Sequence, residues 1–215
     1  MSKLAVCELI SVGTEILLGD ILNTDAQYLS IELAKLGISV IHQSTVGDNR
    51  ERLLAQLDEA AKRSDIIILS GGLGPTPDDL TKEVCCEFFG KEMFLHEPTV
   101  EKIKKYFSSK GIEMAQNNLK QAMLPKDCVI FPNDNGTAPG MAIEKDGVHI
   151  LVLPGPPREL KPMFQNCAVP YLMQFSDRII VSHNIRTFGI GESSMAERVN
   201  DLFDARNPTV APYAK

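Results

Sequence analysis

The first ninety residues of the chain alternate short apolar runs with amphipathic stretches of helical period. The apolar runs predict strands at 4–12, 38–46 and 65–70. The amphipathic stretches predict helices from Thr24, as N-cap, to Gly37, from Asn49 to about residue 60, and from Asp79 onward. This alternation predicts an α/β fold in which a mostly parallel sheet lies between helix layers, with right-handed crossovers.

The second half of the chain departs from this regular alternation. Residues 91–125 are more polar, and we interpret them as an insertion over one sheet edge, with helices at roughly 97–110 and 116–123. Further strands are predicted at 128–131, 140–145 and 148–153, the last two joined by a tight Asp146-Gly147 hairpin, followed by a helix over 158–174.

A change in composition near Ser176 predicts a second, smaller unit. It is expected to hold a strand at 178–188, a helix at 193–203 and a tail that begins another strand. We therefore expect a first domain over 1–175 and an incomplete α/β unit over 176–215.

Composition narrows the class of protein. The 44% hydrophobic and 23% charged content of the 215 residues is that of an ordinary globular protein. The formal net charge of −6 argues against nucleic-acid binding. No apolar run is long enough for a membrane span, and the N-terminus lacks a signal-peptide pattern, so we expect a cytoplasmic protein. Its five cysteines include no C-x-x-C pair and are expected to be reduced core residues.

The most informative segment is residues 66–83, IIILSGGLGPTPDDLTKE. An apolar strand leads into a turn with Gly71, Gly72 and Gly74 and then into a helix, an arrangement in which peptide N–H groups cradle a phosphate. Asp78 and Asp79 follow at once, and two carboxylates beside an anion repel it unless a cation lies between them. The segment predicts a phosphate bound together with a metal ion, although either aspartate could instead simply cap the helix.

Other strand ends carry similar residues. Because ligands of open parallel sheets bind beyond the carboxyl ends of the strands, these residues are expected to meet at one rim. They are Thr14, Glu15, Asp20 and Asn23 after the first strand, Asp48 after the second, and Pro154, Gly155, Pro156 and Pro157 after the strand that ends at Leu153. Each has a plainer explanation, since Asp48 suits a turn, Glu15 a solvated loop, and the prolines a helix start.

Several motif classes are absent. The glycine turn lacks the G-K-[ST] of a Walker loop, and Pro77 stands where G-x-G-x-x-G would need its third glycine. The four histidines show no metal-ligand spacing, so oxygen ligands would favour Mg²⁺ or Mn²⁺. No serine, histidine or cysteine has the neighbours of a covalent nucleophile, which leaves water as the attacking group.

Six blocks of the sequence together resemble the competence/damage-inducible protein family CinA. They are GTEILLGDILNTDAQYLS, VGDNRERL, LSGGLGPTPDDLTKE, NGTAPGM, LPGPPREL and FGIGESSMAE, and the resemblance extends over essentially the whole chain. It implies a three-layer α/β/α domain of the molybdopterin-binding fold, followed near residue 176 by a small unit similar to a KH module.

The resemblance also implies a site and an activity. The residues implied to bind a pterin-phosphate or nucleotide ligand are Thr14, Glu15, Asn23, Gly71, Gly72, Gly74, Thr76, Pro154 and Gly155. The implied activity is hydrolysis of ADP-ribose to AMP and ribose 5-phosphate with Mg, Mn or Co. Asp48 and Asp79 would then hold the metal and orient water. The family further suggests a homodimer, in which Glu192 would reach a neighbouring subunit's cleft.

Two other functions stay open. The same cleft would serve a non-catalytic module that binds a pterin or nucleotide phosphate. Molybdenum-cofactor biosynthesis is a third possibility, from which the GTEILLGD and GIGESS blocks point away. Full-length relatives carry a further domain associated with nicotinamide mononucleotide deamidation. Since this sequence ends at Lys215, before such a domain, we do not expect that activity here.

Overall fold

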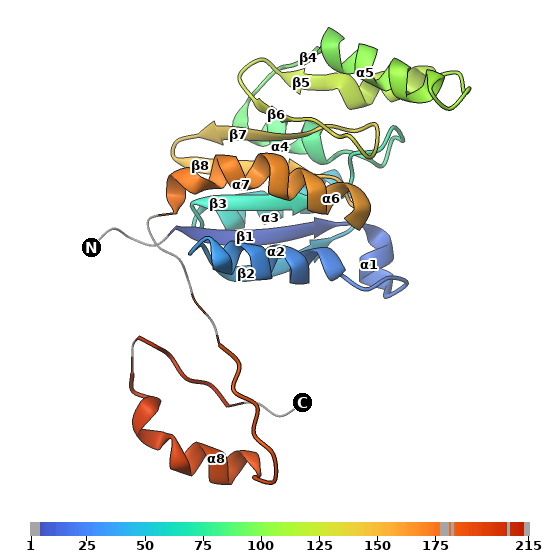
Figure 1. Cartoon of the computed structure of the whole chain (residues 1–215). Helices are drawn as coiled ribbons and strands as arrows, with labels where there is room; N and C mark the ends of the chain where they lie inside the picture. Colours follow the sequence, from blue (N-terminus) through green and yellow to red (C-terminus); the bar gives the residue numbers. More distant parts are fainter. Residues whose placement is uncertain (1–4, 177–180, 182, 206, 213–215) are drawn as a thin grey trace. The chain divides into compact units, whose positions relative to one another are not determined.

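A computed structural model describes residues 5–176, 181, 183–205 and 207–212. The chain divides into two compact units, residues 1–180 and 181–215, which are described one at a time (Figure 1). Within the described ranges, no helix has both the length and the apolar character that a membrane crossing requires.

The first unit is built on a six-stranded sheet with strand order β2-β1-β3-β8-β7-β6. Its strands are β1 (Val6–Val12), β2 (Ser39–Val46), β3 (Ile66–Ser70), β6 (Val129–Phe131), β7 (Gly140–Lys145) and β8 (Val148–Leu153). The four strands β2, β1, β3 and β8 pair in parallel, whereas β7 and β6 are antiparallel. The predicted mostly parallel sheet is therefore confirmed, as is the β7–β8 hairpin, whose Asp146 and Gly147 both have positive φ.

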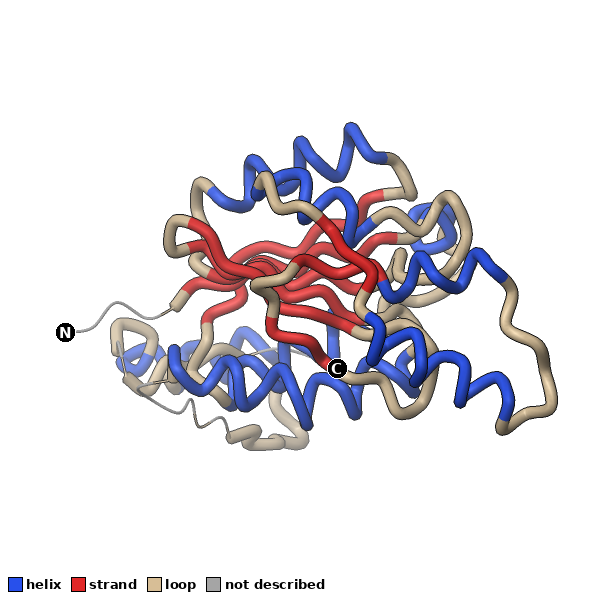
Figure 2. Tube along the Cα trace, turned by 90° about the horizontal axis from the view of Figure 1, so that it is seen from above, coloured by secondary structure: helices blue, strands red, loops and turns tan. Residues whose placement is uncertain are grey.

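Helices cover both faces of this sheet and make a three-layer sandwich (Figure 2). The α-helices among the described residues of this unit are α1 (Thr14–Leu18), α2 (Thr24–Lys35), α3 (Arg50–Ala61), α4 (Thr81–Phe89), α5 (Glu97–Ser108), α6 (Pro157–Met163) and α7 (Val169–Leu172), and α8 (Glu192–Arg198) belongs to the second unit. Helices α3 and α4 pack in one buried cluster, and α2, α6 and α7 in the other. Because successive strand residues alternate between faces, Ile67 and Leu69 of β3 join the first cluster while Ile66 and Ile68 join the second.

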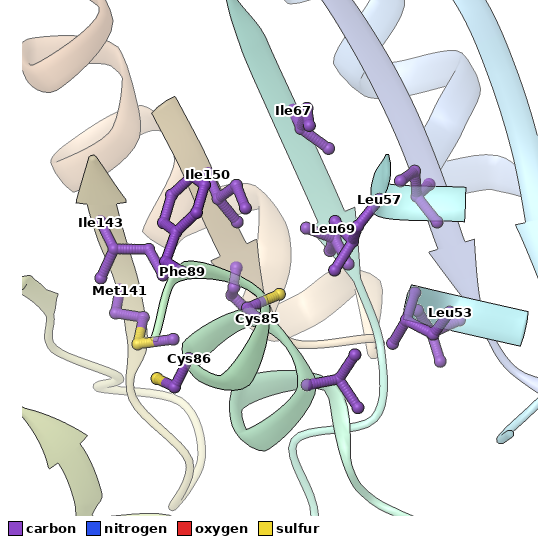
Figure 3. Packing of buried hydrophobic residues seen from close by; sticks show 14 of the residues in the cluster. Leu53, Leu57, Ile67, Leu69, Cys85, Cys86, Phe89, Met141, Ile143 and Ile150 are labelled. Carbon is purple, nitrogen blue, oxygen red and sulfur yellow. The ribbon is translucent and has the colours of Figure 1, made fainter. Parts of the chain in front are cut away.

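The first cluster fixes the start of α4, from which the site is built. In it Leu53 and Leu57 of α3 pack with Leu69 of β3 and with Cys85 of α4 (Figure 3). Each of these side chains is completely buried, and burying one leucine contributes about 1.5–3 kcal/mol. The turn between β3 and α4 is therefore held at both ends by well-packed elements.

The insertion at 91–125 has more strand than its pattern predicts. Helix α5 lies where a helix is expected, but in place of the α-helix predicted over 116–123 the chain forms a 3₁₀ segment, η1 (Gln116–Ala122). Two short strands, β4 (Met93–Leu95) and β5 (Met123–Pro125), pair antiparallel in a second sheet. Each is only three residues long and lies in a stretch whose pattern is helical and polar, so the sequence alone did not reveal them.

Several predicted boundaries near the rim are wrong. Asn23, not Thr24, caps α2, with its Oδ1 accepting from the Ala26 N–H at 3.1 Å. Helix α4 begins at Thr81 and not at Asp79, because Asp79 instead accepts hydrogen bonds from Thr76. The segment after Gly13, expected as a loop, contains the one-turn helix α1.

The helix predicted over 158–174 is broken into several pieces. Helix α6 is followed by a π-helical turn, η2 (Phe164–Ala168), then by α7 and a 3₁₀ turn, η3 (Met173–Phe175). Pro162 lies inside α6 and has no N–H to donate, which disturbs the regular ladder just before η2. The prediction of a helical segment was right, but the segment is not one regular α-helix.

The second unit contains α8 and a 3₁₀ turn, η4 (Asn200–Leu202), which together cover most of the helix predicted over 193–203. Of the strand predicted at 178–188, residues 178–180 and 182 lie outside the described residues, and residue 181 and residues 183–188 form no strand. Residues 207–212 of the predicted final strand are likewise not in a strand. A strand requires a partner to hydrogen-bond to, and the unit's described residues supply none.

Candidate functional site

The carboxyl ends of four parallel strands meet at one rim and surround a cavity of about 540 Å³. The register aligns these ends, since Ser11 of β1 lies opposite both Thr45 of β2 and Ser70 of β3, and Ser70 lies opposite Leu153 of β8. In the sheet, β2 lies on one side of β1 and β3 lies on the other side. The strand order therefore reverses at the carboxyl end of β1. Such a point is the usual ligand site of an open α/β sheet.

The glycine turn after β3 adopts a shape that only glycine fits. Gly71 has φ +99°, and a Cβ there would lie 2.1 Å from the Val12 carbonyl oxygen. Gly72 has φ +65°, and its Cβ would lie 2.2 Å from Oγ1 of Thr81. Thr81 fixes the turn by donating from Oγ1 to the Gly71 carbonyl at 2.9 Å. The backbone of β3 therefore approaches β1 and α4 more closely than any side chain would allow.

The turn presents free backbone donors. The Gly71 N–H donates to the Leu153 carbonyl at 3.1 Å, and the Thr76 N–H donates to Asp79. Among the described residues, no acceptor is bonded to the N–H groups of Gly72, Leu73 and Gly74, all of which line the cavity. Consecutive unpaired N–H groups next to a helix start make a binding site for an anion.

Asp79 is held locally at this turn. Its Oδ2 accepts from the Thr76 N–H at 3.0 Å and from the Thr76 hydroxyl at 2.6 Å. Gly74 leaves room for it, since a Cβ at Gly74 would lie 2.3 Å from that same oxygen. The pKa of the neighbouring Asp78 is lowered, mainly by the polar Thr76 nearby, which favours the ionised carboxylate.

Asp48 is held by a partner far away in sequence. Its Oδ2 accepts from the Thr14 N–H at 2.9 Å and from the Thr14 hydroxyl at 2.8 Å. In return the Asp48 N–H donates to Oγ1 of Thr14 at 3.2 Å. The loops after β1 and β2 are thus tied together, and Thr14 orients the carboxylate of Asp48.

The remaining predicted residues have more varied positions. Asn23 lines the cavity, but its Oδ1 caps α2 and its Nδ2 donates to Oγ of Ser11 at 2.9 Å, so both ends are used within the fold. The carboxylate of Glu15 lies beside Gly13, where a Cβ would be 2.7 Å from Oε1. Gly155 packs on the glycine turn, its Cβ position 3.4 Å from the Gly71 Cα.

Most of the predicted set is therefore brought to one cavity. The predicted residues that line it are Glu15, Asn23, Asp48, Gly71, Gly72, Gly74, Asp78, Asp79, Pro154, Gly155, Pro156 and Pro157. Thr14 and Thr76 do not line it directly and instead contact Asp48 and Asp79. Asp20 does not line it, and Glu192 belongs to the second unit.

The donor set suits a hard divalent cation. No group of three or more histidine, cysteine or acidic side chains in the described part of the chain forms a ready-made metal cage. Mg²⁺ usually needs only one or two carboxylates, because phosphate oxygens and water complete its shell. Asp48 and Asp79 line one cavity, and in each the threonine hydrogen bonds converge on Oδ2, which leaves Oδ1 for a ligand. These residues fit such an ion bound together with a phosphate.

The insertion supplies site residues that sequence reasoning missed. Lys120 donates from Nζ to the carbonyl oxygens of Thr76, at 2.8 Å, and of Asp79, and it lies 3.7 Å from Glu83. Gln121 lines the cavity and donates from Nε2 to the Leu73 carbonyl at 3.3 Å. The insertion therefore clamps the glycine turn from outside, and no local pattern reveals this because more than forty residues separate the partners.

A buried lysine completes this clamp. Lys82 is 2% exposed and donates from Nζ to the carbonyl oxygens of Gln121, at 2.6 Å, and Met123, at 3.2 Å. Burial lowers its pKa from 10.5 to about 8, partly offset by Glu83. Part of the Lys82 population is therefore neutral in mildly alkaline solution.

A further loop forms part of the cavity wall. Asn133 donates from Nδ2 to the Ala138 carbonyl at 2.9 Å and to Oε2 of Glu159 at 2.8 Å. Gly136 packs against that carboxylate, which would lie 2.1 Å from a Cβ there. Thr137, Ala138 and Glu159 thereby reach the cavity. The NGTAPGM block was the sequence signal for this wall.

One side of the cavity is apolar. Ile16, Ile21 and Leu22, in and after α1, line it, and Ile21 and Leu22 are 51% and 85% exposed. Large apolar side chains this exposed at a cavity mouth indicate contact with a ligand or partner. The cavity thus combines a polar, anion-binding floor with an apolar side.

Two family models match this chain, one in each of its two units. Residues 8–174 match the family model of a probable molybdopterin binding domain, and residues 182–215 match that of the damage-inducible protein CinA KH domain. A putative competence-damage inducible protein of Clostridioides difficile is 55% identical over 209 residues, which are 97% of this chain and 50% of the relative. A CinA-like protein of Dictyoglomus turgidum is 54% identical over 210 residues, or 51% of its length. The chain spans about half the length of these curated relatives.

Solved structures agree with the fold. The protein CinA of unknown function from Thermoplasma acidophilum is 31% identical, with a TM-score of 0.71, and the match covers 77% of this chain and 98% of that one. The tungsten cofactor synthesizing protein MoaB from Pyrococcus furiosus is 20% identical, with a TM-score of 0.53, over 83% of this chain and all of that one. At that lower identity the likeness is one of fold alone.

Proposed function

The chain belongs to the CinA family, and from this premise we propose that its cavity hydrolyses the pyrophosphate bond of ADP-ribose or a similar nucleoside diphosphate derivative. The products would be AMP and ribose 5-phosphate, and the reaction would require a divalent ion such as Mg, Mn or Co. The expected resemblance to this family and to its molybdopterin-binding fold is confirmed by the two family matches and by the Thermoplasma structure.

One observation carries the proposal. Unpaired backbone N–H groups at Gly72 to Gly74 and the carboxylates of Asp48 and Asp79 line the same cavity. Amide donors attract a phosphate, whereas the carboxylates repel it. An arrangement that holds both is typical of a site where a phosphate and a divalent cation bind together.

In this proposal, backbone amides and carboxylates have different roles. The turn amides would bind the pyrophosphate and stabilise the negative charge that develops during hydrolysis. Asp48 and Asp79 would hold the metal ion and orient a water molecule, with Thr14 and Thr76 keeping each carboxylate in place. When bound, the ion supplies positive charge that stabilises the phosphate oxygens.

The shape of the cavity supports a ligand of nucleotide size. Its volume of about 540 Å³ lies within the roughly 300–1,000 Å³ of small-molecule sites. The apolar side formed by Ile16, Ile21 and Leu22 would cover a flat base while the phosphates lie on the glycine turn. A ligand with one apolar end and one charged end matches this division.

The test is release of AMP from ADP-ribose by the purified chain with Mg²⁺, Mn²⁺ or Co²⁺. We expect AMP with at least one ion, and a loss of about 100-fold or more in turnover for Asp79→Asn and Asp48→Asn. Asp58→Asn removes an exposed charge on the outer face of α3 and is the matched control, with turnover unchanged. No AMP from a correctly folded chain with any ion would reject the hydrolase.

The same samples examine the alternative of a non-catalytic binding module. If ADP-ribose binds the folded wild type without turnover, and Asp79→Asn weakens that binding, the cavity is a binding site and not an active site. Calorimetry of wild type and Asp79→Asn separates these outcomes.

A further inference from the structure

Glu159 places a carboxylate in the cavity wall, apart from those that would hold the metal ion. It belongs to the first turn of α6, its side chain is 11% exposed, and it lines the cavity. Its Oε2 accepts a hydrogen bond from Nδ2 of Asn133 at 2.8 Å. Gly136 makes room for this oxygen, since a Cβ there would lie 2.1 Å away. The carboxylate is thus fixed in the way that Asp79 is fixed, by one polar neighbour and one glycine.

The other oxygen of Glu159 is open to a ligand. No donor in the described part of the chain is hydrogen-bonded to Oε1, and Oε1 is not one of the buried polar atoms that lack a partner. It is therefore accessible to solvent. Arg158 lies 3.7 Å from Oε1, which is too far for a hydrogen bond, and its side chain is 78% exposed. Because Glu159 lines the cavity, Oε1 is the acceptor that it offers to a molecule bound there.

The fold accounts for only one of the two oxygens. A glutamate three residues after a helix cap often accepts from the backbone N–H of the cap residue. At α6 this is impossible, because the cap residue Pro156 has no N–H, and neither has Pro157 at the first position. The hydrogen bond from Asn133 needs one acceptor oxygen, which a glutamine would supply as well. These contacts therefore require neither the negative charge of Glu159 nor its second oxygen.

Other carboxylates of the cavity are less suited to accept a proton. A carboxylate that holds a cation is a weaker base, and Asp48 and Asp79 would hold the metal ion. Asp25 and Glu15 line the cavity too, but no hydrogen bond in the described structure fixes either carboxylate. Asp78 is exposed, and its lowered pKa makes it a weaker base. What remains is a carboxylate that is fixed, mostly buried and free at one oxygen, which is the one on α6.

We propose that Glu159 is the general base of the hydrolysis, a role that rests on the proposed function of this cavity. Its Oε1 takes a proton from the attacking water while the water oxygen forms a bond to one phosphorus of the pyrophosphate. The bond from that phosphorus to the bridging oxygen breaks, and its electron pair leaves with the other phosphate. The second hydrogen of the water stays on the new phosphate oxygen, and the first passes from Glu159 to solvent. Such a base contributes about 10²–10⁴-fold to a rate, and Asn133 keeps it oriented.

The experiment measures release of AMP from ADP-ribose by Glu159→Gln. The variant keeps the size of the side chain and an acceptor for Asn133 but cannot take up a proton. We expect kcat to fall about 100-fold or more, while KM for ADP-ribose and the Mg²⁺ concentration that gives half the maximal rate stay within about threefold. Glu51→Gln, at an exposed position of α3, is the matched control and should keep the wild-type kcat.

Rescue by a small base separates catalysis from a merely structural role. Glu159→Ala leaves a space beside Gly136, and formate is a carboxylate small enough to enter it. Formate should raise the turnover of Glu159→Ala at least about 10-fold. It should not raise that of Glu159→Gln, in which the space is filled. Thermal unfolding shows that both variants are folded at the assay temperature.

Three results would overturn the assignment. One is a kcat of Glu159→Gln within about threefold of the wild type. Another is a rise in its Mg²⁺ requirement like that of Asp79→Asn, which would make Glu159 a metal ligand. The third is no rescue of folded Glu159→Ala by formate. In each of these cases the wild type still releases AMP, so the proposed hydrolysis stands, whereas a wild type that releases no AMP with any ion rejects both the hydrolysis and its base.

Discussion

The two ends of the parallel sheet hold carboxylates in opposite states. At the amino end of β1, Glu8 is completely buried and accepts three hydrogen bonds of 2.9 Å, one from Gln56 and two from Arg63. At the carboxyl end, Asp48 and Asp79 each use one oxygen for a threonine, and Asp25 has a buried oxygen with no partner. Residues of the same charge are thus saturated at one rim and unsaturated at the other.

This difference distinguishes a carboxylate whose hydrogen bonds are complete from one that keeps an oxygen free for a ligand. A buried charge is tolerated when its hydrogen bonds are complete, so Glu8 belongs to the folding of the sheet. Carboxylates with spare oxygens beside a cavity and unpaired amides keep that capacity for a ligand. The two kinds of carboxylate differ in how completely they are paired, and not in burial alone.

The largest expected effect is on stability at the amino end. Glu8→Ala removes three hydrogen bonds to a charged group and leaves a cavity, so we expect the free energy of unfolding in urea to fall by about 3 kcal/mol. The affinity of the remaining folded molecules for AMP should be unchanged. Glu51→Ala, at an exposed position of α3, is the control and should change stability by less than about 0.5 kcal/mol. A loss of AMP affinity in Glu8→Ala would break the division between the two rims.

The carboxyl end also contains a buried ion of its own, Lys82. Burial lowers its folded pKa to about 8, whereas in the unfolded chain it stays near about 10.4. Between these values the unfolded state binds more protons than the folded state, so stability rises with pH through this window. Below about pH 8 the full cost of the buried charge is present.

We expect this lysine to add about 2 kcal/mol to the stability of the wild type between pH 7.5 and pH 10. Lys82→Met should lack this contribution, and the difference between the two unfolding curves removes the titration of cysteines and tyrosines. Equal pH dependence in both proteins would show that Lys82 is not buried as a titrating group, and the clamp on the glycine turn would need another explanation.

Sequence reasoning recovered what local pattern encodes. The apolar run of β3, the glycine turn and the start of α4 are contiguous, so their order alone predicted an anion site at a strand end. Asp48 and Asp79 reached one cavity because parallel register aligns the strand ends, which the alternation of elements also predicted.

Contacts made across long separations were not predictable in this way. Lys120 lies 44 residues from Thr76, and its role depends on how η1 folds back over the turn. Asp25 was not predicted as a notable residue, because a missing hydrogen-bond partner is visible only once all neighbours are placed. The strand expected at 178–188 is a second example: its described residues, 181 and 183–188, have no pairing partner among the described residues and form no strand.

The smallest of the expected effects comes from a substitution that adds one methyl group beside Asp79 at the carboxyl end of the sheet. Gly74→Ala adds one methyl group, which would lie 2.3 Å from Oδ2 of Asp79 and so must displace that side chain from Thr76. Gly74 has no positive φ, so alanine fits its backbone and global stability should change by less than about 1 kcal/mol. We expect turnover of ADP-ribose to fall about 10-fold, because a misplaced catalytic group loses its orientation.

A double-mutant cycle shows whether this effect passes through Asp79. If Gly74 matters only by leaving room for the carboxylate, Gly74→Ala should cost nothing further in an Asp79→Ala background, where the residual turnover or AMP affinity is compared. Additive losses would mean that the glycine acts on the ligand through its own N–H or through the shape of the turn. In that case the spare oxygen of Asp79 would no longer explain the difference between the two ends of the sheet. The unpaired backbone N–H groups of the glycine turn would then be the remaining explanation.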